Sequence, residues 1–388
     1  MELIVIKDFF FRTNKRKNNS IQGLYLFFLV IFLFYLFIKI SDLDLDFKFL
    51  TNESGFALSN QWLTNYNPTD TRIVAYLTGV FNTVRLVVVG IFLASIIGFI
   101  VGIARLSNNW LVSNIATAYV EIIRNVPLLL QIIFWWSFAL SLPRISEYIN
   151  FANLVFISNR GIAFPKIIIS QLSFFIFIAL IILLFFIPSV KNTISSKMNV
   201  DFSYLRILFF GYVPLLLVTI CILFLVNAVN IDQPSISVSD TNVIRYANGF
   251  VVTTEFIAIL LGLVLYTASF IAEIVRGAIQ SLPKGQNEAA LALGLTDYQA
   301  LSLIVLPQAL RIIIPPVTNQ YLNLTKNSSL AVVIGYSDLF LISGIIMNKA
   351  GHAIPMFVLI ILTYQLMSFV IALIMNYFNK KVALVGNQ

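Results

Sequence analysis

The sequence of 388 residues is 59% hydrophobic and 11% charged, with a mean hydropathy of +0.91. Soluble domains carry about 25% charged residues, so this composition excludes a water-soluble globular protein and indicates a polytopic membrane protein. The net charge of +8 requires no nucleic-acid partner, because basic residues of membrane proteins gather in cytoplasmic loops. Its only cysteine, Cys221, excludes an intrachain disulfide, and its only histidine, His352, excludes a histidine-rich metal site.

The apolar segments predict about eight membrane-spanning helices, since a span needs about 20 apolar residues. They cover residues 21–40, 75–104, 113–140, 167–188, 207–228, 252–276, 309–333 and 354–378. The first segment is long enough to span and no small-residue cleavage site follows it, so it is not a signal peptide. The seventh is the least uniform, because Pro315, Pro316, Asn319, Asn323 and Lys326 interrupt it.

The placement of lysine and arginine predicts the orientation of these spans. With a cytoplasmic N-terminus, the segments on the cytoplasmic side hold the larger share of the basic residues, whereas the acids Asp42, Asp44 and Asp46 start the loop after the first span. Both termini are therefore expected in the cytoplasm. The polar segments 41–74, 142–166 and 229–251 are expected on the outer side.

A short punctuated segment, NEAALALGLTDYQALSLIVLP, separates the sixth and seventh spans. Residues Gln286–Leu293 are mostly strong helix formers but are too few and too polar to span. Gly294 follows directly and suits a helix end in the left-handed conformation. We therefore predict a short cytoplasmic helix that ends in a tight turn, with Ala289, Ala290 and Ala292 exposed to another protein.

The second half of this segment predicts another helix. Thr296 and Gln299 have the spacing of a capping box, in which each residue bonds to the backbone N–H of the other. Apolar residues follow as far as Leu306, and Pro307 disfavours helix at the residue before it. The whole segment is thus predicted to form a helical elbow that returns to the membrane and stops at Pro307.

The spacing within the elbow is specific. Glu288-Ala289-Ala290 is followed after three residues by Gly294, and then after nine by Ile304-Val305-Leu306-Pro307. This pattern resembles the cytoplasmic motif of membrane subunits of binding-protein-dependent ABC importers, Glu-Ala-Ala-x3-Gly-x9-Ile-x-Leu-Pro. The stretch FIAEIVRGAIQSLPKG resembles the polar-amino-acid branch of these importers. The stretches GIARLSNNWLV and YVEIIRNVPLLLQIIFWW resemble more specifically the longer, eight-span membrane subunit of general L-amino-acid importers.

The resemblance implies an all-α membrane protein with the type I permease fold of ABC importers. Its core of five helices would be the segments 75–104, 113–140, 252–276, 309–333 and 354–378, with one helix before the core and two inserted into it. Residues 1–74 would comprise a cytoplasmic tail, the first span and a periplasmic loop. Residues 75–388 would form the transmembrane domain, with inserted helices in 143–250 and an ATPase-coupling segment at 281–307.

The resemblance also implies partners in the bacterial inner membrane. These are a second, related permease subunit, two ATPase subunits, and a periplasmic protein that delivers the amino acid. The residues expected to couple to the ATPase are Gly285, Glu288, Ala289, Ala290, Gly294, Leu306 and Pro307. The chain has no Gly-x4-Gly-Lys-Ser/Thr loop to cradle phosphates. ATP and Mg²⁺ are therefore expected on the ATPase, and no cofactor, metal or catalytic residue on this chain.

Charged residues inside the spans need an explanation, because they are costly in a bilayer. Glu121 with Arg124, and Glu273 with Arg276, have the spacing of ion pairs on one helix face. Lys326 follows the double proline within a polar stretch. It either faces a hydrated path and attracts a substrate carboxylate, or pairs with an acid of the partner subunit. Asn319, Asn323 and Ser329 are further candidates for the path.

Two other functions compete with that of an ABC importer subunit. A secondary amino-acid transporter needs carboxylates or ion sites within the membrane, but Glu121, Glu255 and Glu273 all lie near the ends of their spans. A membrane-embedded enzyme is disfavoured by the single histidine, the single cysteine and the lack of a carboxylate pair at mid-depth.

Overall fold

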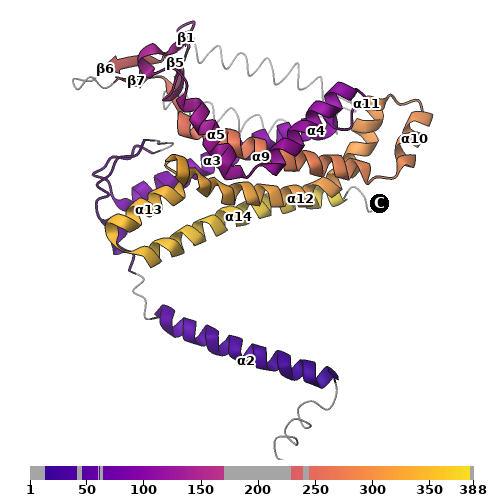
Figure 1. Cartoon of the computed structure of the whole chain (residues 1–388), viewed down its shortest axis with the longest axis horizontal. Coiled ribbons are helices and arrows are strands. Elements are labelled where there is room, and N and C mark those ends of the chain that lie inside the picture. The colour runs from indigo at the N-terminus through magenta and orange to yellow at the C-terminus, as the bar shows by residue number, and fades with distance from the viewer. Residues whose placement is uncertain are drawn as a thin grey trace, which may run out of the picture. The chain divides into compact units, whose positions relative to one another are not determined.

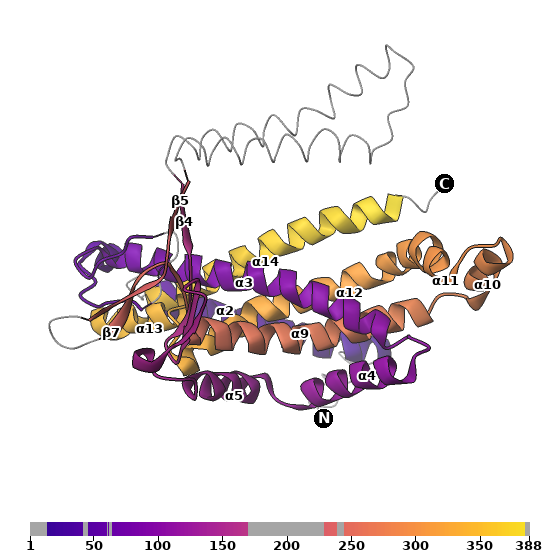
Figure 2. The same ribbon diagram turned by 90° about the horizontal axis from the view of Figure 1, so that it is seen from above.

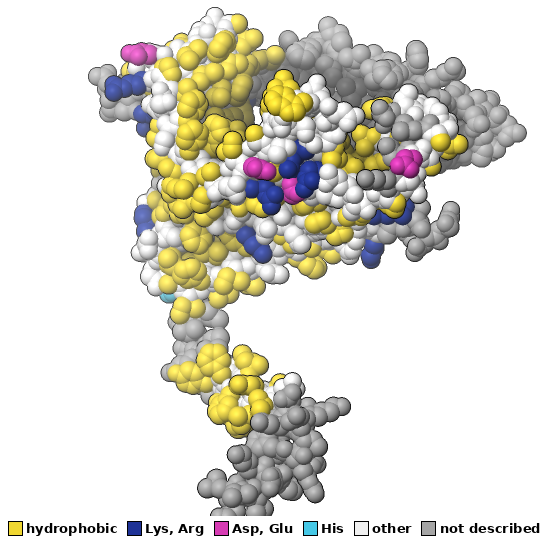
Figure 3. All heavy atoms as spheres, turned by 45° about the vertical axis from the view of Figure 1, so that its right-hand side comes forward, with side chains coloured by type: hydrophobic (Ala, Val, Ile, Leu, Met, Phe, Trp, Pro, Cys, Tyr) yellow, Lys and Arg dark blue, Asp and Glu magenta, His cyan; other side chains and the backbone are white. Residues whose placement is uncertain are grey.

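The computed structural model describes residues 14–41, 46–59, 61, 64–169, 229–238 and 244–384, which are mostly helical (Figures 1 and 2). The two predicted inserted spans at 167–188 and 207–228 lie outside the described residues, except for residues 167–169, which belong to a strand. On the face shown in Figure 3, apolar side chains cover broad areas and charged side chains form small groups. This surface is typical of a protein embedded in lipid.

Long apolar helices account for most of the predicted spans. Within the described residues, four helical runs are long and apolar enough to cross a membrane. They are α3 (Arg72–Ala104), α9 (Thr254–Gln280), the run Ala300–Ile334 and α14 (Ala353–Leu384). A shorter apolar stretch, Ile21–Tyr35, lies in α2 (Asn14–Ser41). The structure thus confirms the helical segments predicted at 21–40, 75–104, 252–276, 309–333 and 354–378.

The segment predicted as one span at 113–140 is instead a pair of helices, α4 (Trp110–Asn125) and α5 (Leu128–Leu140), bent by 105°. The bend follows from Pro127, because the residue before a proline is driven out of the helical region. Val126 is accordingly extended (φ −98°, ψ 129°). The Gln131 amide donates to the carbonyl oxygens of Ile123 and Val126, both at 2.9 Å, and so stabilises the end of α4.

The prediction of an all-α protein is wrong between α5 and α9, where the chain forms strands. After the 3₁₀ turn η2 (Ile145–Glu147), four strands make an antiparallel sheet in the order β1-β2-β3-β8. Their bounds are β1 Ile149–Phe151, β2 Val155–Ser158, β3 Gly161–Phe164 and β8 Phe250–Thr253. Two further hairpins pair β4 (Lys166–Ile169) with β5 (Val229–Asp232) and β6 (Ser235–Val238) with β7 (Ile244–Asn248). Short runs of β-branched and aromatic residues between turn residues favour these strands.

The two prolines and the polar residues that make the seventh predicted span the least uniform do not break its α-helix. Helix α12 (Leu306–Asn327) contains both Pro315 and Pro316 and remains α-helical to Asn327. The irregular backbone lies after it, in the 3₁₀ segment η5 (Ser328–Ile334), which ends at Gly335 in the left-handed conformation (φ 75°). The change of helix type therefore follows Lys326 and does not occur at the prolines.

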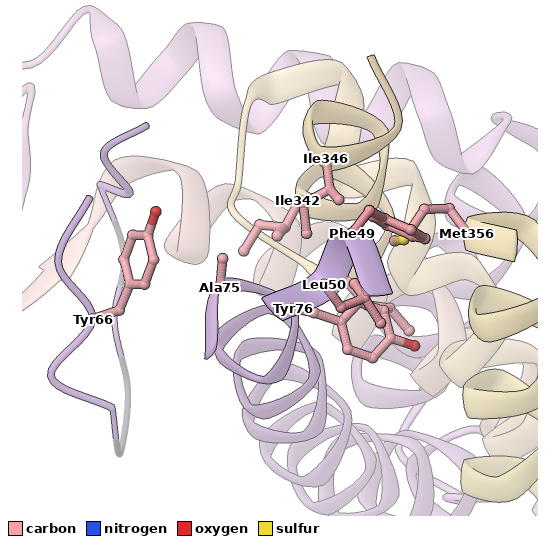
Figure 4. Close-up of a cluster of buried hydrophobic side chains, with 9 residues drawn as sticks. Phe49, Leu50, Tyr66, Ala75, Tyr76, Ile342, Ile346 and Met356 are labelled. Carbon is pink, nitrogen blue, oxygen red and sulfur yellow. The ribbon is translucent and has the colours of Figure 1, made fainter. Parts of the chain in front are cut away.

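The chain divides into two compact units, of which the first comprises residues up to Arg85 and residues 337–374. Its core joins the loop after α2, including the 3₁₀ helix η1 (Lys48–Thr51), to α3, α13 (Leu339–Ala350) and α14 (Figure 4). Its buried members are Phe49, Leu50, Tyr66, Ala75, Tyr76, Leu339, Ile342, Ile346 and Met356. The side chains of Asn82 and Thr83 hold α13 by bonds of 2.8 and 2.9 Å to the carbonyl of Ser337 and the N–H of Leu339. The loop after α2 is therefore a folded part of the first unit.

The second unit comprises residues 86–336 and 375–388, and α9 is its central helix. Two glycines of α3 bring that helix against α9. A Cβ atom at Gly98 would lie 2.6 Å from the Cβ of Ile271, and one at Gly102 would lie 2.7 Å from the Cβ of Val275. This Gly-x3-Gly spacing lets two membrane helices approach closely through van der Waals packing.

We expect Gly98→Val to destabilise the protein by about 1–3 kcal/mol, because the added atoms force α3 away from α9. Thermal unfolding in detergent, followed by loss of the monodisperse species on size-exclusion chromatography, measures the effect. Gly277→Val on α9 is the matched control, since no heavy atom lies within 4 Å of its Cβ position. Equal melting temperatures for the two variants would contradict the proposed packing.

Candidate functional site

The elbow between α9 and α12 is the first candidate site. Figures 1 and 2 both place α10 (Lys284–Ala292) and α11 (Asp297–Gln299) at one end of these two helices. Gly294 separates α10 from α11 and has a φ of +81°. Its neighbours close the turn, as Leu293 N–H donates to Ala289 O at 3.1 Å and Leu295 N–H to Ala290 O at 3.2 Å. The predicted helix, left-handed glycine and turn are confirmed.

The second half of the elbow departs from the prediction in its helix type. The capping box is present: Thr296 N–H donates to Gln299 Oε1 at 2.9 Å, and Gln299 N–H to Thr296 Oγ1 at 3.3 Å. However, α11 has only three residues and continues as the π-helical segment η4 (Ala300–Val305), in which Leu306 N–H bonds to Leu301 O. The helix does not stop at Pro307, because a proline is tolerated in the first turn of α12, where its missing N–H costs little.

The exposure of the elbow residues changes the predicted contact surface. Ala289 and Ala292 are exposed, but Ala290 is only 3% exposed and is buried within the elbow, as is Ala300. The prediction that Ala290 is exposed to a partner is therefore wrong, because the elbow folds back on itself. Leu293 and Tyr298, which belong to no recognised motif in the sequence, are 83% and 78% exposed.

We define the elbow surface as the exposed residues Gly285, Glu288, Ala289, Ala292, Leu293 and Tyr298. Pro307 is also exposed, whereas Leu306 is half-buried at the start of α12. The amide of Gln308 on α12 donates to the Gln286 side chain on α10 at 3.3 Å and to Ile304 O at 3.1 Å. The elbow surface is thus connected to α12 by a side-chain bond as well as by the backbone.

The substrate-path candidates form a stripe along α12. Asn319, Asn323 and Lys326 follow one another at helical spacings of four and three residues, which places them on one face, and all three are exposed in the isolated chain. Ser329 is half-buried and donates its hydroxyl to the Lys326 carbonyl at 2.9 Å, so it supports the helix end. No acid among the described residues lies within ion-pair distance of Lys326. We call Asn319, Asn323 and Lys326 the polar stripe.

A cluster of charges joins α3, α4 and α9. The Glu273 carboxylate on α9 accepts hydrogen bonds from Arg105 and Arg276, and the Arg124 guanidinium lies 3.7 Å away. Arg124 also lies over the ring of Phe270, 5.0 Å from its centroid. The predicted pair of Glu273 with Arg276 is confirmed. Among the described residues Glu121 forms no ion pair, so the predicted pair of Glu121 with Arg124 is wrong, because Arg124 reaches across to α9 instead.

This cluster does not resemble a metal site, because the groups around the Glu273 carboxylate are positively charged guanidinium groups. Across the part of the chain that the structure describes, no three or more His, Cys, Asp or Glu side chains are grouped to hold a metal ion. The described geometry therefore offers an exposed elbow, a polar stripe on the helix after it, and a network of charges that ties three helices together.

Comparison with known proteins shows which family the chain resembles. Residues 200–384 match the family described as "Binding-protein-dependent transport system inner membrane component". The chain is 42% identical to the general L-amino acid transport system permease protein AapQ of Rhizobium johnstonii over 87% of this chain and 84% of that protein. It is 37% identical to the putative amino-acid ABC transporter permease protein YhdX of Escherichia coli over 87% of this chain and 86% of that one.

The chain belongs to this family of permeases. A third relative, the glutamate/glutamine/aspartate/asparagine transport system permease protein BztB of Rhodobacter capsulatus, is 35% identical over 88% of this chain and 86% of its own length. As a permease, the chain is a multi-pass membrane subunit of an ABC transporter, and its relatives are named as transport proteins and not as enzymes.

We expect Glu273→Gln to lower the stability of the permease by about 1–3 kcal/mol, because it leaves half-buried guanidinium groups without a charged partner. Glu255→Gln is the matched control: it makes the same change on the same helix at a residue that forms no ion pair within the described part of the chain. Thermal unfolding in detergent compares the two variants. A melting temperature of Glu273→Gln equal to that of the control would show that the network contributes nothing.

Proposed function

We propose that this permease carries L-amino acids across the bacterial inner membrane in an importer powered by a separate ATPase. The observation that carries the proposal is the elbow between α9 and α12, in which the Glu-Ala-Ala-x3-Gly pattern forms a short helix that ends in the left-handed turn at Gly294. The relatives that match most of the chain are named for the transport of amino acids. Family membership does not favour the alternative of a secondary transporter.

The elbow surface would dock on the ATPase and transmit its movement to the translocation path. Exposed Leu293 and Tyr298 are large apolar side chains outside the long helices, and burial in a groove of a partner removes them from water. Gln286 and Gln308 join α10 to α12, and α12 carries the polar stripe. A displacement of the elbow therefore moves the helix whose residues we assign to the path.

The complete importer would contain further subunits. We propose a second, related permease subunit, two ATPase subunits that bind ATP and Mg²⁺, and a soluble amino-acid-binding protein. The permease itself would have about eight spans, including the predicted span at 207–228 and the part of the span predicted at 167–188 that follows β4, with both termini in the cytoplasm. Lys326 would attract the substrate carboxylate, since it is an exposed cation on the polar stripe.

Reconstitution in proteoliposomes tests this function. The permease, its partner permease, the ATPase and the binding protein are purified, and uptake of a panel of labelled L-amino acids is measured with and without ATP. We expect uptake that needs ATP, the ATPase and the binding protein, and that survives dissipation of the proton and sodium gradients. Uptake that persists without the ATPase and collapses with an ion gradient would establish a secondary transporter instead.

We expect Gly294→Val to reduce ATP-dependent uptake at least tenfold while the permease still inserts and assembles. A β-branched residue is strained at a φ of +81°, whereas the space around the Cβ position is open, so the effect acts through the shape of the elbow. Uptake and ATP hydrolysis are measured on the same proteoliposomes. Gly277→Val, at a right-handed and equally open position, controls for the change of residue. Wild-type uptake by Gly294→Val would refute the role of the turn.

We expect Lys326→Met to raise the concentration of amino acid needed for half-maximal uptake at least tenfold, because the path loses its positive charge. Lys326→Arg keeps the charge and should restore most of the affinity. Uptake over a range of substrate concentrations measures both variants. If Lys326→Met keeps both the rate and the range of substrates, Lys326 neither attracts the substrate nor pairs with an acid of the partner subunit.

A further inference from the structure

The β1–β2 hairpin presents apolar side chains outside the long helices. Strand β1 is the edge of its sheet, and all three of its residues are exposed. Ile149, Phe151 and Leu154 are 40%, 57% and 47% exposed. We define the hairpin tip as residues 151–154. Resting on the proposed function, we propose that the hairpin tip and β1 are the docking surface for the soluble amino-acid-binding protein.

The hairpin tip is held in one conformation. Its two central residues, Ala152 and Asn153, have left-handed φ values of 52° and 58°, which an alanine rarely adopts. Asn150 fixes the turn with its side chain, because Oδ1 accepts from Asn153 N–H at 2.9 Å and Nδ2 donates to Asn153 Oδ1 at 2.6 Å. Leu154 N–H closes the turn on Phe151 O at 2.9 Å. A preorganised tip loses little conformational entropy when a partner binds.

Lipid is not the occupant of this surface. Open sheet edges do not face the hydrocarbon of a bilayer, because their backbone groups would be left without hydrogen-bond partners. The edge strand β1 must therefore lie outside the hydrocarbon. It reads Ile-Asn-Phe, and both of its apolar side chains are exposed within the described part of the chain. Apolar side chains grouped at an exposed edge are typical of a site where another protein binds.

The charges of the strand region favour an acidic partner. Among the described residues between α5 and α9, the basic side chains are Arg144, Arg160, Lys166 and Arg245, and all four are exposed. The acidic side chains in the same region are Glu147 and Asp232. This excess of positive charge attracts a protein with an acidic face and speeds its encounter with the docking surface. A soluble binding protein with such a face is the partner to which we commit.

The sheet is connected rigidly to α9. Strand β8 continues into α9 without a break, and the hydroxyl of Thr254, the first residue of α9, donates to Asn159 O at 2.7 Å. Tyr246 on β7 adds a bond of 2.7 Å to Ser158 on β2. The 27 residues of α9 span about 40 Å and lead at their other end to the elbow. Figure 2 shows the strands and α10 at opposite ends of this helix. Docking at the sheet is thereby linked to the ATPase-coupling end.

The test uses the binding protein that supports uptake by the wild-type complex. This protein is titrated into the reconstituted complex while ATP hydrolysis is measured. For the double variant Phe151→Ser/Leu154→Ser we expect the half-saturating concentration of binding protein to rise at least tenfold, with unchanged hydrolysis in its absence. Val238→Ser is the matched control, because Val238 is 63% exposed at the end of β6. We expect it to stay within twofold of wild type.

A photo-crosslinking amino acid at position 151 of the otherwise unchanged complex tests the contact if the double variant fails to assemble. We expect a crosslink to the binding protein from position 151 and none from position 238. A double variant that titrates like wild type, or a crosslink from position 151 only to another permease, overturns the docking surface. A wild-type complex without ATP-dependent uptake overturns the proposed function itself, so the two failures are distinguishable.

Discussion

The close approach of α3 to α9 is the contact on which the rest of the second unit depends. It requires Gly98 and Gly102, because any side chain there would overlap Ile271 or Val275. Without water between helices in a bilayer, packing of this kind supplies much of the force that holds them together. The approach also sets the position of Arg105, the residue after α3, whose guanidinium bonds to Glu273.

Charge pairing then holds α4, together with α3, against α9. Glu273 carries one negative charge against three guanidinium groups, from the residue after α3, from α4 and from α9 itself. A carboxylate within an apolar helix is costly unless it is paired, and here the pairing joins helices that are distant in sequence. The bend at Pro127 lets the pair α4 and α5 follow α9, while the Gln131 amide satisfies carbonyl groups at the bend. Helix α9 therefore has a defined position between the sheet at one end and the elbow at the other.

The elbow combines a closely packed turn with an irregular helical segment. Ala290 and Ala300 are buried between α10 and η4, and their small side chains let these segments pack closely. The π-helical segment η4, which contains Ala300, leads directly into α12. Such segments are rare and occur frequently at functional sites.

The features that depend on local chemistry could be predicted from the sequence. The long apolar runs, the left-handed Gly294 and the capping box of Thr296 and Gln299 all follow from residues close together in the chain. Pro127 is likewise a local signal for the bend, but the length of the apolar run led to the prediction of a single span at 113–140. Tertiary structure alone decided that Arg124 pairs with Glu273 and not with Glu121, that Ala290 is buried, and that the segment after α5 forms a sheet. In each case the choice depends on a partner distant in sequence, since strand pairing and ion pairing across helices are set by which segments the fold brings together.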